Sequence, residues 1–95
     1  MNHEIKIHPQ YYARVANGSK TFEIRDNDRG YQSGDTVKMK EWDPEKQSPA
    51  STTPKGYTGS PNIIATVGYV HVLDSSRVVF SLLNVKKEKS VKSSV

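Results

Sequence analysis

The chain has 95 residues, of which 25% are charged and 34% apolar, and its formal net charge is +4. This length allows one domain, and the composition is typical of a soluble protein without a membrane span, which would need roughly 20 consecutive apolar residues. Cysteine is absent, which excludes disulfides, thiolate metal sites and a cysteine nucleophile, and residues 1–12 lack the pattern of a secretory signal, so we expect a cytoplasmic protein.

The positive charge is concentrated near the carboxyl end. Segment 84–95 contains four lysines and one glutamate and therefore carries +3 of the net charge. Because it has few apolar side chains, we predict a flexible basic tail, which either attracts phosphate or only improves solubility. Segment 43–62 contains four of the five prolines and is predicted to be a long loop. A single domain is expected over residues 1–83.

The first two elements are a strand and a short helix. Residues 1–7 alternate weakly between apolar and polar side chains, as in a strand. Residues 9–17 begin with a proline, which suits the first turn of a helix, and are followed by a glycine, which commonly ends one. The positions expected on the buried face of this helix are Tyr12, Val15 and Ala16.

Further strands follow the helix. Residues 21–25 alternate, with Phe22 and Ile24 opposite Glu23 and Arg25, which is typical of a half-buried strand. Additional strands are predicted at 36–42, 64–73 and 77–83, with Val37 and Met39 as the inward set of the first of them. Gly68 suggests a bulge or sharp bend. The predicted fold class is mainly β with one or two short helices (α+β), a small curved sheet closing towards a barrel.

Charged side chains gather around the start of segment 21–25. Glu23 and Arg25 share one face of the strand, about 7 Å apart along the chain, and Lys20 stands where the helix passes into the strand. From spacing alone, the more common interpretation is a solvated face with weak cross-strand ion pairs, each contributing roughly 0.2 to 1 kcal/mol.

The residues GSKTFEIR (18–25) resemble the GxKxxExR signature of the ASCH domain, a branch of the PUA-like superfamily. The wider pattern HEIKIHPQYYARVANGSKTFEIRDNDRGYQSGD, with a later YTG, is similar to the small bacterial and phage family DUF3850. The resemblance covers about residues 2–83 and excludes the basic tail. With this resemblance included, we favour a ligand-binding site at these charged residues over a solvated face with weak ion pairs.

The resemblance implies a PUA-like β-barrel whose cleft lies between the first helix and the sheet and binds RNA or a nucleotide. Its charged motif positions correspond to Lys20, Glu23 and Arg25. Lys20 and Arg25 would donate to phosphate or to a base carbonyl, and Glu23 would orient one of them or accept from an exocyclic amine. Cofactors and metals are not expected, and the protein is expected to be a monomer.

The alternative function is a metal-independent hydrolase, with Lys20 and Glu23 as the catalytic residues. Some relatives of the ASCH domain remove the acetyl group from N4-acetylcytidine, and others cleave RNA. The amidohydrolase subgroup has a threonine at the position of Glu23 and a further glutamate in a later strand, and this chain has neither. Thr21 remains a candidate hydroxyl nucleophile. A protein of phage or plasmid origin that binds a host protein is a third alternative.

Residues outside the motif complete the predicted ligand site. Arg29 follows the strand and adds a cation, while Trp42 and Tyr57 offer rings that can stack on unpaired bases. Tyr57 and Thr58 belong to the YTG sequence of the long loop, which we expect to fold over the cleft. The three histidines and the turn carboxylates, which follow no metal-ligand spacing, are expected to be structural: His3, His8, His71, Asp26 and Asp28.

Overall fold

Six elements of secondary structure follow the predicted order along the chain. The computed structural model describes residues 1–45 and 56–88. The elements are β1 (Asn2–Ile7), α1 (Pro9–Ala16), β2 (Phe22–Asp26), β3 (Thr36–Glu41), β4 (Ile63–Val72) and β5 (Arg77–Lys87). The mainly β fold with one short helix is therefore as predicted.

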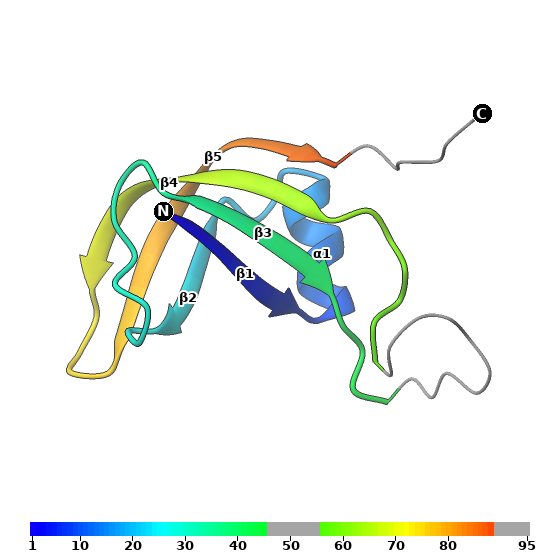
Figure 1. Ribbon diagram of the computed structural model, residues 1–95, viewed down its shortest axis with the longest axis horizontal. Helices are drawn as coiled ribbons and strands as arrows, with labels where there is room; N and C mark the ends of the chain where they lie inside the picture. Colours follow the sequence, from blue (N-terminus) through cyan, green and yellow to red (C-terminus); the bar gives the residue numbers. More distant parts are fainter. Residues whose placement is uncertain (46–55, 89–95) are drawn as a thin grey trace.

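The strands form one sheet in the order β1-β3-β4-β5-β2. β1 and β3 are parallel, and all other neighbouring strands are antiparallel. Figure 1 shows that the sheet is strongly curled, like half of a barrel, with α1 near one of its ends. Because β1 and β2 lie at opposite edges of the sheet, the curl turns these two edges toward each other.

The hydrophobic core fills the inside of the curl. Alternating residues of β1, β3, β4 and β5 point into it, in agreement with the period of two that strands impose. Its buried apolar side chains are Ile5, Ile7, Tyr12, Val15, Tyr31, Val37, Met39, Ile63, Ala65, Val67, Val78, Phe80 and Leu82. The predicted inward pair of β3, Val37 and Met39, is fully buried.

The helix covers one end of this core, where it packs against β3 and β5. Pro9 occupies its first turn, and Gly18 follows it with a φ of +86°, the left-handed conformation that glycine adopts without strain. Tyr12 and Val15 are buried as predicted, but the prediction for Ala16 is wrong because Ala16 is exposed. Two buried positions, Tyr12 and Val15, form the inward stripe of this short helix, and Ala16 lies outside that stripe.

The last strand ends later than predicted, which moves the boundary between the sheet and the predicted tail. The strand continues to Lys87, so residues 84–87 belong to the sheet and not to a flexible tail. Ile63 and Ile64 of β4 pair with Lys87 and Lys86. Backbone pairing with a neighbouring strand satisfies the polar groups of this segment whatever its side chains are, which explains why composition alone misplaced the boundary. The remainder of the predicted tail, 89–95, lies outside the described residues.

One glycine and one loop shape the rest of the sheet. The register between β4 and β5 shifts between Val67 and Val70, so the predicted bulge at Gly68 is confirmed. The middle of the predicted long loop, 46–55, lies outside the described residues. The ends of that loop are tied together by a backbone bridge between Trp42 and Tyr57. Within the described residues, no helix has the length and apolar character needed to span a membrane.

Candidate functional site

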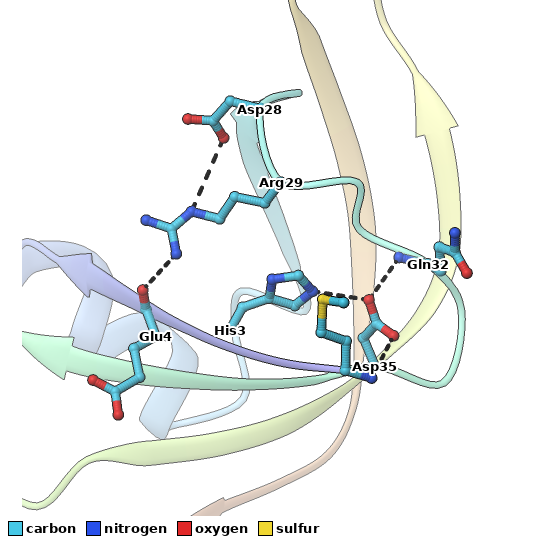
Figure 2. A network of polar contacts seen from close by, with 7 residues as sticks. His3, Glu4, Asp28, Arg29, Gln32 and Asp35 are labelled. Carbon is cyan, nitrogen blue, oxygen red and sulfur yellow. Dashed lines mark hydrogen bonds and ion pairs between the residues drawn. The ribbon is translucent and has the colours of Figure 1, made fainter.

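Two arginine side chains join the facing edges of the sheet. Arg25 of β2 donates from Nη2 to the carbonyl oxygen of Lys6 in β1, at 2.6 Å. Arg29, just beyond β2, donates from Nη1 to the carbonyl oxygen of Glu4, at 2.9 Å, as Figure 2 shows. Side chains therefore link β1 and β2, which are not neighbours in the hydrogen-bonded order of the sheet.

A buried carboxylate organises the charged residues of the motif. Lys20 Nζ donates to Glu23 Oε1 at 2.6 Å and to the carbonyl oxygen of Phe22 at 2.7 Å. Arg25 Nε donates to the other oxygen, Glu23 Oε2, at 3.1 Å. We call Lys20, Glu23 and Arg25 the charged triad. The structure thus brings together the three residues that the motif predicted, with the acidic one between the two cations.

The buried face of β2 is the charged one. The alternation predicted for this strand is confirmed, but Glu23 is only 6% exposed, whereas Phe22 and Ile24 are 43% and 45% exposed. Burying an ionised group costs free energy, whereas burying an apolar group is favourable. A buried ion pair seldom repays that cost by its own attraction. The orientation of β2 is therefore opposite to the one that hydrophobic burial favours.

Three adjoining cavities lie along this strand. The first, of about 370 Å³, is lined by Tyr11, Lys20, Phe22, Glu23 and Ile24. The second, of about 230 Å³, is lined by Lys6, Ile7, His8, Tyr11, Glu23, Ile24 and Arg25. The third, of about 390 Å³, is lined by Glu4, Ile5, Lys6, Arg25, Asp26, Asp28, Arg29, Tyr31, Lys40 and Tyr57.

These cavities share walls and form one cleft. Tyr11 and Glu23 line both the first and the second, while Lys6 and Arg25 line both the second and the third. We call the whole the β1–β2 cleft, because most of its residues come from these two strands and the segments that follow them. Its length, from α1 to Tyr57, offers room for a ligand larger than a single phosphate.

The third cavity mixes charges of both signs. Four cations line it together with three carboxylates: Lys6, Arg25, Arg29, Lys40, Glu4, Asp26 and Asp28. Glu4 pairs with Lys40 at 3.3 Å, and Asp28 lies 4.0 Å from Arg29 (Figure 2). Both of these pairs are substantially exposed to solvent, where ion pairs contribute little and exchange partners readily. A phosphorylated ligand could therefore compete for these cations.

A buried network holds the segment that carries Arg29 and Tyr31. Asp35 Oδ2 lies 2.8 Å from His3 Nε2 and accepts the backbone N–H of Gln32 at 3.0 Å (Figure 2). These hydrogen bonds, together with that from the terminal amine of Met1, lower the pKa of Asp35 to about 2. The ring of Tyr31 lies between the rings of His3 and Phe80, at 4.6 and 4.7 Å. The network fixes one wall of the cleft.

The predicted site residues divide into two groups. Lys20, Glu23, Arg25, Arg29 and Tyr57 all line the cleft. The other two, Trp42 and Thr58, do not line any of its three cavities.

Neighbouring contacts account for the positions of Trp42 and Thr58. Thr58 Oγ1 donates to Glu41 Oε1 at 2.6 Å, which fixes the base of the loop. The ring of Trp42 lies beside the cleft, with Lys6 Nζ 4.5 Å from its centroid.

The sequence analysis placed the cleft beside the first helix but named no lining residue from β1 or α1. Glu4, Lys6, His8 and Tyr11 line the cleft, although none of them belongs to the motif. For Lys6 the sequence contained an indication of exposure, since the alternation of residues 1–7 places it away from the core. Its proximity to Arg25 follows from the curl of the sheet and has no local signature.

The described residues contain no group of three or more histidine, aspartate or glutamate side chains placed to hold a metal ion. Of the histidines, His3 is buried in the Asp35 network, and His71 is exposed on β4, where it stacks on Tyr69 at 6.3 Å. Asp26 and Asp28 lie in the wall of the third cavity and are not part of such a group. The cleft offers hydrogen-bond donors, charges and ring surface.

Comparison with known proteins gives two results. The family described as "Domain of unknown function (DUF3850)" matches residues 2–82. A protein of Escherichia phage P2, described as "Uncharacterized 12.9 kDa protein in GpA 3'region", is 45% identical over 40 residues. That alignment covers 42% of this chain and 37% of the phage protein, so it spans well under half of its relative's length.

Proposed function

The chain belongs to the DUF3850 family, and from the geometry of its cleft we propose that it binds RNA or a nucleotide between β1 and β2. We further propose that the domain is of the ASCH type within the PUA-like superfamily. The curled sheet supports this assignment, as does the position of the GxKxxExR residues, whose charged members line one cleft.

The buried charged triad is the observation that carries the proposal. Glu23 faces inward, where its charge incurs a desolvation cost that ion pairs seldom repay, and it holds Lys20 and Arg25 at 2.6 and 3.1 Å. Side chains fixed in this way lose little conformational entropy when a ligand binds, which favours affinity. Lys20 is 15% and Arg25 is 25% exposed, so both cations remain accessible from the cleft.

A phosphorylated ligand fits the donors of the cleft. The guanidinium group of Arg25 and the ammonium group of Lys20 make charge-assisted hydrogen bonds, which are the strongest available to a phosphate. Tyr11 and Phe22 add exposed ring surface in the first cavity, beside Lys20. The cations that would bind a phosphate therefore lie next to the rings on which an attached planar base could stack.

Binding is better supported than hydrolysis. Lys20 Nζ donates to Phe22 O and Glu23 Oε1, and within the described residues no hydrogen bond joins it to the hydroxyl of Thr21, from which it would have to take a proton. The mechanism of the amidohydrolase alternative needs such a proton transfer. Incubation with N4-acetylcytidine and with short RNA, followed by product analysis, would detect either hydrolytic activity.

The proposal is tested by calorimetric titration with nucleoside monophosphates and short RNA. Lys20→Met removes the charge and keeps most of the apolar stem, and we expect it to weaken binding by about tenfold, since a charged hydrogen bond contributes roughly 1.5 to 3 kcal/mol. Lys86→Met is the matched control, because it changes the net charge equally on an exposed part of β5. Equal affinities for the two variants, or no binding by the unaltered protein, would refute the proposal.

A further inference from the structure

A row of rings follows the rim of the β1–β2 cleft. The rings of His8 and Tyr11 are stacked, with centroids 6.5 Å apart and planes 19° apart. His8 also contacts Trp42, at 5.9 Å between centroids, and the backbone of Trp42 is bridged to that of Tyr57. We call Tyr11, His8, Trp42 and Tyr57 the aromatic strip. Its members come from α1, the residue before α1, the end of β3 and the base of the loop.

A lysine accompanies each of the three aromatic residues of the strip. Lys20 Nζ lies 5.6 Å from the ring centroid of Tyr11, Lys6 Nζ lies 4.5 Å from that of Trp42, and Lys40 Nζ lies 5.9 Å from that of Tyr57. These distances are in the range of cation–π contacts. Three of the four rings of the strip therefore have a positive charge close by.

The rings of the strip are not part of the hydrophobic core. Tyr11 is 44% exposed, His8 is exposed, and Trp42 and Tyr57 are partly exposed. Tyr11 and His8 also line the second cavity, and Tyr57 lines the third. Core packing therefore does not account for the gathering of these rings, and the strip borders the proposed binding cleft.

We propose that single-stranded nucleic acid lies along the aromatic strip, with bases stacked on its rings and phosphates near Lys6, Lys20 and Lys40. This inference rests on the proposed function and extends it from one nucleotide in the cleft to several along the rim. Aromatic rings bind unpaired bases of any sequence, since every base has a flat face, and lysines beside them attract the backbone. Bases within a duplex are already stacked on one another, so a duplex does not fit this surface.

The charges argue for nucleic acid over a peptide. Aromatic grooves also bind proline-rich peptides, but such peptides gain nothing from a lysine beside each ring. An anionic polymer is attracted by each of these lysines and releases its counterions on binding, which increases its affinity. A protein ligand is the outcome to expect if short oligonucleotides do not recognise the strip.

The test uses Tyr11→Ala in the full-length chain, with Tyr69→Ala as the matched control. Tyr69 is 72% exposed on β4, and its ring stacks on His71 much as Tyr11 stacks on His8, but it lines none of the three cavities of the cleft. The ligands are a nucleoside monophosphate, single-stranded RNA and DNA of about six nucleotides, and an RNA duplex of equal length. Trp42 is the only tryptophan of the chain, so its fluorescence reports binding at the strip directly.

We expect single-stranded oligonucleotides to bind more tightly than the monophosphate and to quench Trp42. Tyr11→Ala should weaken their binding by about fivefold or more, in line with the loss of one stacked base. Because Tyr11 also lines the first cavity, the affinity for the monophosphate should fall as well. Tyr69→Ala should behave like the unaltered protein. The RNA and DNA arms show whether the 2′-hydroxyl is recognised.

The outcomes separate this inference from the proposed function. If Lys20→Met weakens monophosphate binding while Tyr11→Ala leaves oligonucleotide affinity unchanged, the cleft proposal stands and the strip proposal is overturned. A duplex that binds more tightly than the single strands would also overturn it. Failure of both the monophosphate and the oligonucleotides to bind removes both proposals together.

Discussion

Arg25 Nη2 lies 2.6 Å from the carbonyl oxygen of Lys6, and this contact joins two strands that lie at opposite edges of the sheet. The same guanidinium group also binds Glu23, so one side chain connects the curl of the sheet to the charged triad. Arg25 is consequently both a structural link and a candidate ligand-binding residue. Effects on stability and on binding must be measured separately at this position.

Replacement of Arg25 by alanine should destabilise the protein. The change removes the hydrogen bond to Lys6 O and leaves Glu23 with Lys20 as its only cation, and we expect a loss of about 1.5 to 3 kcal/mol in the free energy of unfolding. Urea denaturation measures it. Arg14→Ala, on the exposed face of α1, should cost less than about 0.5 kcal/mol. Similar losses for the two variants would show that the hydrogen bond from Arg25 to β1 contributes nothing to stability.

Removal of the buried carboxylate alone should lower the stability of the fold more than removal of the carboxylate together with one of its cationic partners. Glu23→Leu leaves Lys20 and Arg25 without their shared counter-ion, and we expect it to cost about 1 to 3 kcal/mol. Adding Lys20→Met should recover part of that loss, because an uncompensated ammonium group is removed as well. A double-mutant cycle by urea denaturation measures the coupling. A double variant that is less stable than Glu23→Leu would contradict this account. Neither variant should bind the nucleotide.

The pH dependence of stability should reveal the Asp35 network. The pKa of Asp35 is lowered to about 2 by its hydrogen bonds to His3, Gln32 and the terminal amine. A carboxylate with a lowered pKa in the folded state contributes stability above its unfolded pKa of about 3.9, and this contribution is lost as the pH falls through about 2. We expect the free energy of unfolding to decrease from about pH 4 downward, and Asp35→Asn should flatten that decrease. Parallel curves for the two proteins would assign the acid sensitivity to other groups.

Two glycines of the loop base provide a test of the packing around Trp42. A Cβ atom on Gly56 would lie 2.2 Å from Trp42 Nε1, whereas one on Gly59 would have open space, and both residues have φ values near +90°. Both changes to alanine should therefore incur backbone strain, of roughly 1 to 3 kcal/mol. Only Gly56→Ala should also displace the indole and shift its fluorescence emission. An unchanged emission spectrum in Gly56→Ala would show that the ring is not packed as described.

Local sequence patterns predicted most of the secondary structure and the clustering of the charged residues of the motif. Pro9 and Gly18 bounded the helix, and the apolar alternation around Val37 and Met39 indicated a strand with one buried face. Lys20, Glu23 and Arg25 lie within six residues of chain, so the geometry of one strand was enough to bring them together. Predictions of this kind succeed because they depend on neighbours along the backbone.

Other features depended on contacts between distant segments. Composition assigned Lys86 and Lys87 to a tail, but pairing with Ile64 and Ile63 extends β5 through them. The location of Trp42 and Thr58 beside the cleft, with Thr58 bound to Glu41, follows from the bridge at the base of the loop. None of these partners can be inferred from sequence spacing, because backbone hydrogen bonding between strands is nearly independent of side-chain type.

The sequence by itself determined the order of the elements, several of the apolar side chains that form the core and the presence of a cationic and acidic cluster after the helix. Only the tertiary structure decided that the charged face of β2 would be the buried one. Alternation specifies two faces and leaves open which of them turns inward. That choice depends on the curl of the sheet, which brings β2 to the edge of β1, where the carbonyl oxygen of Lys6 accepts a hydrogen bond from the arginine that also binds Glu23.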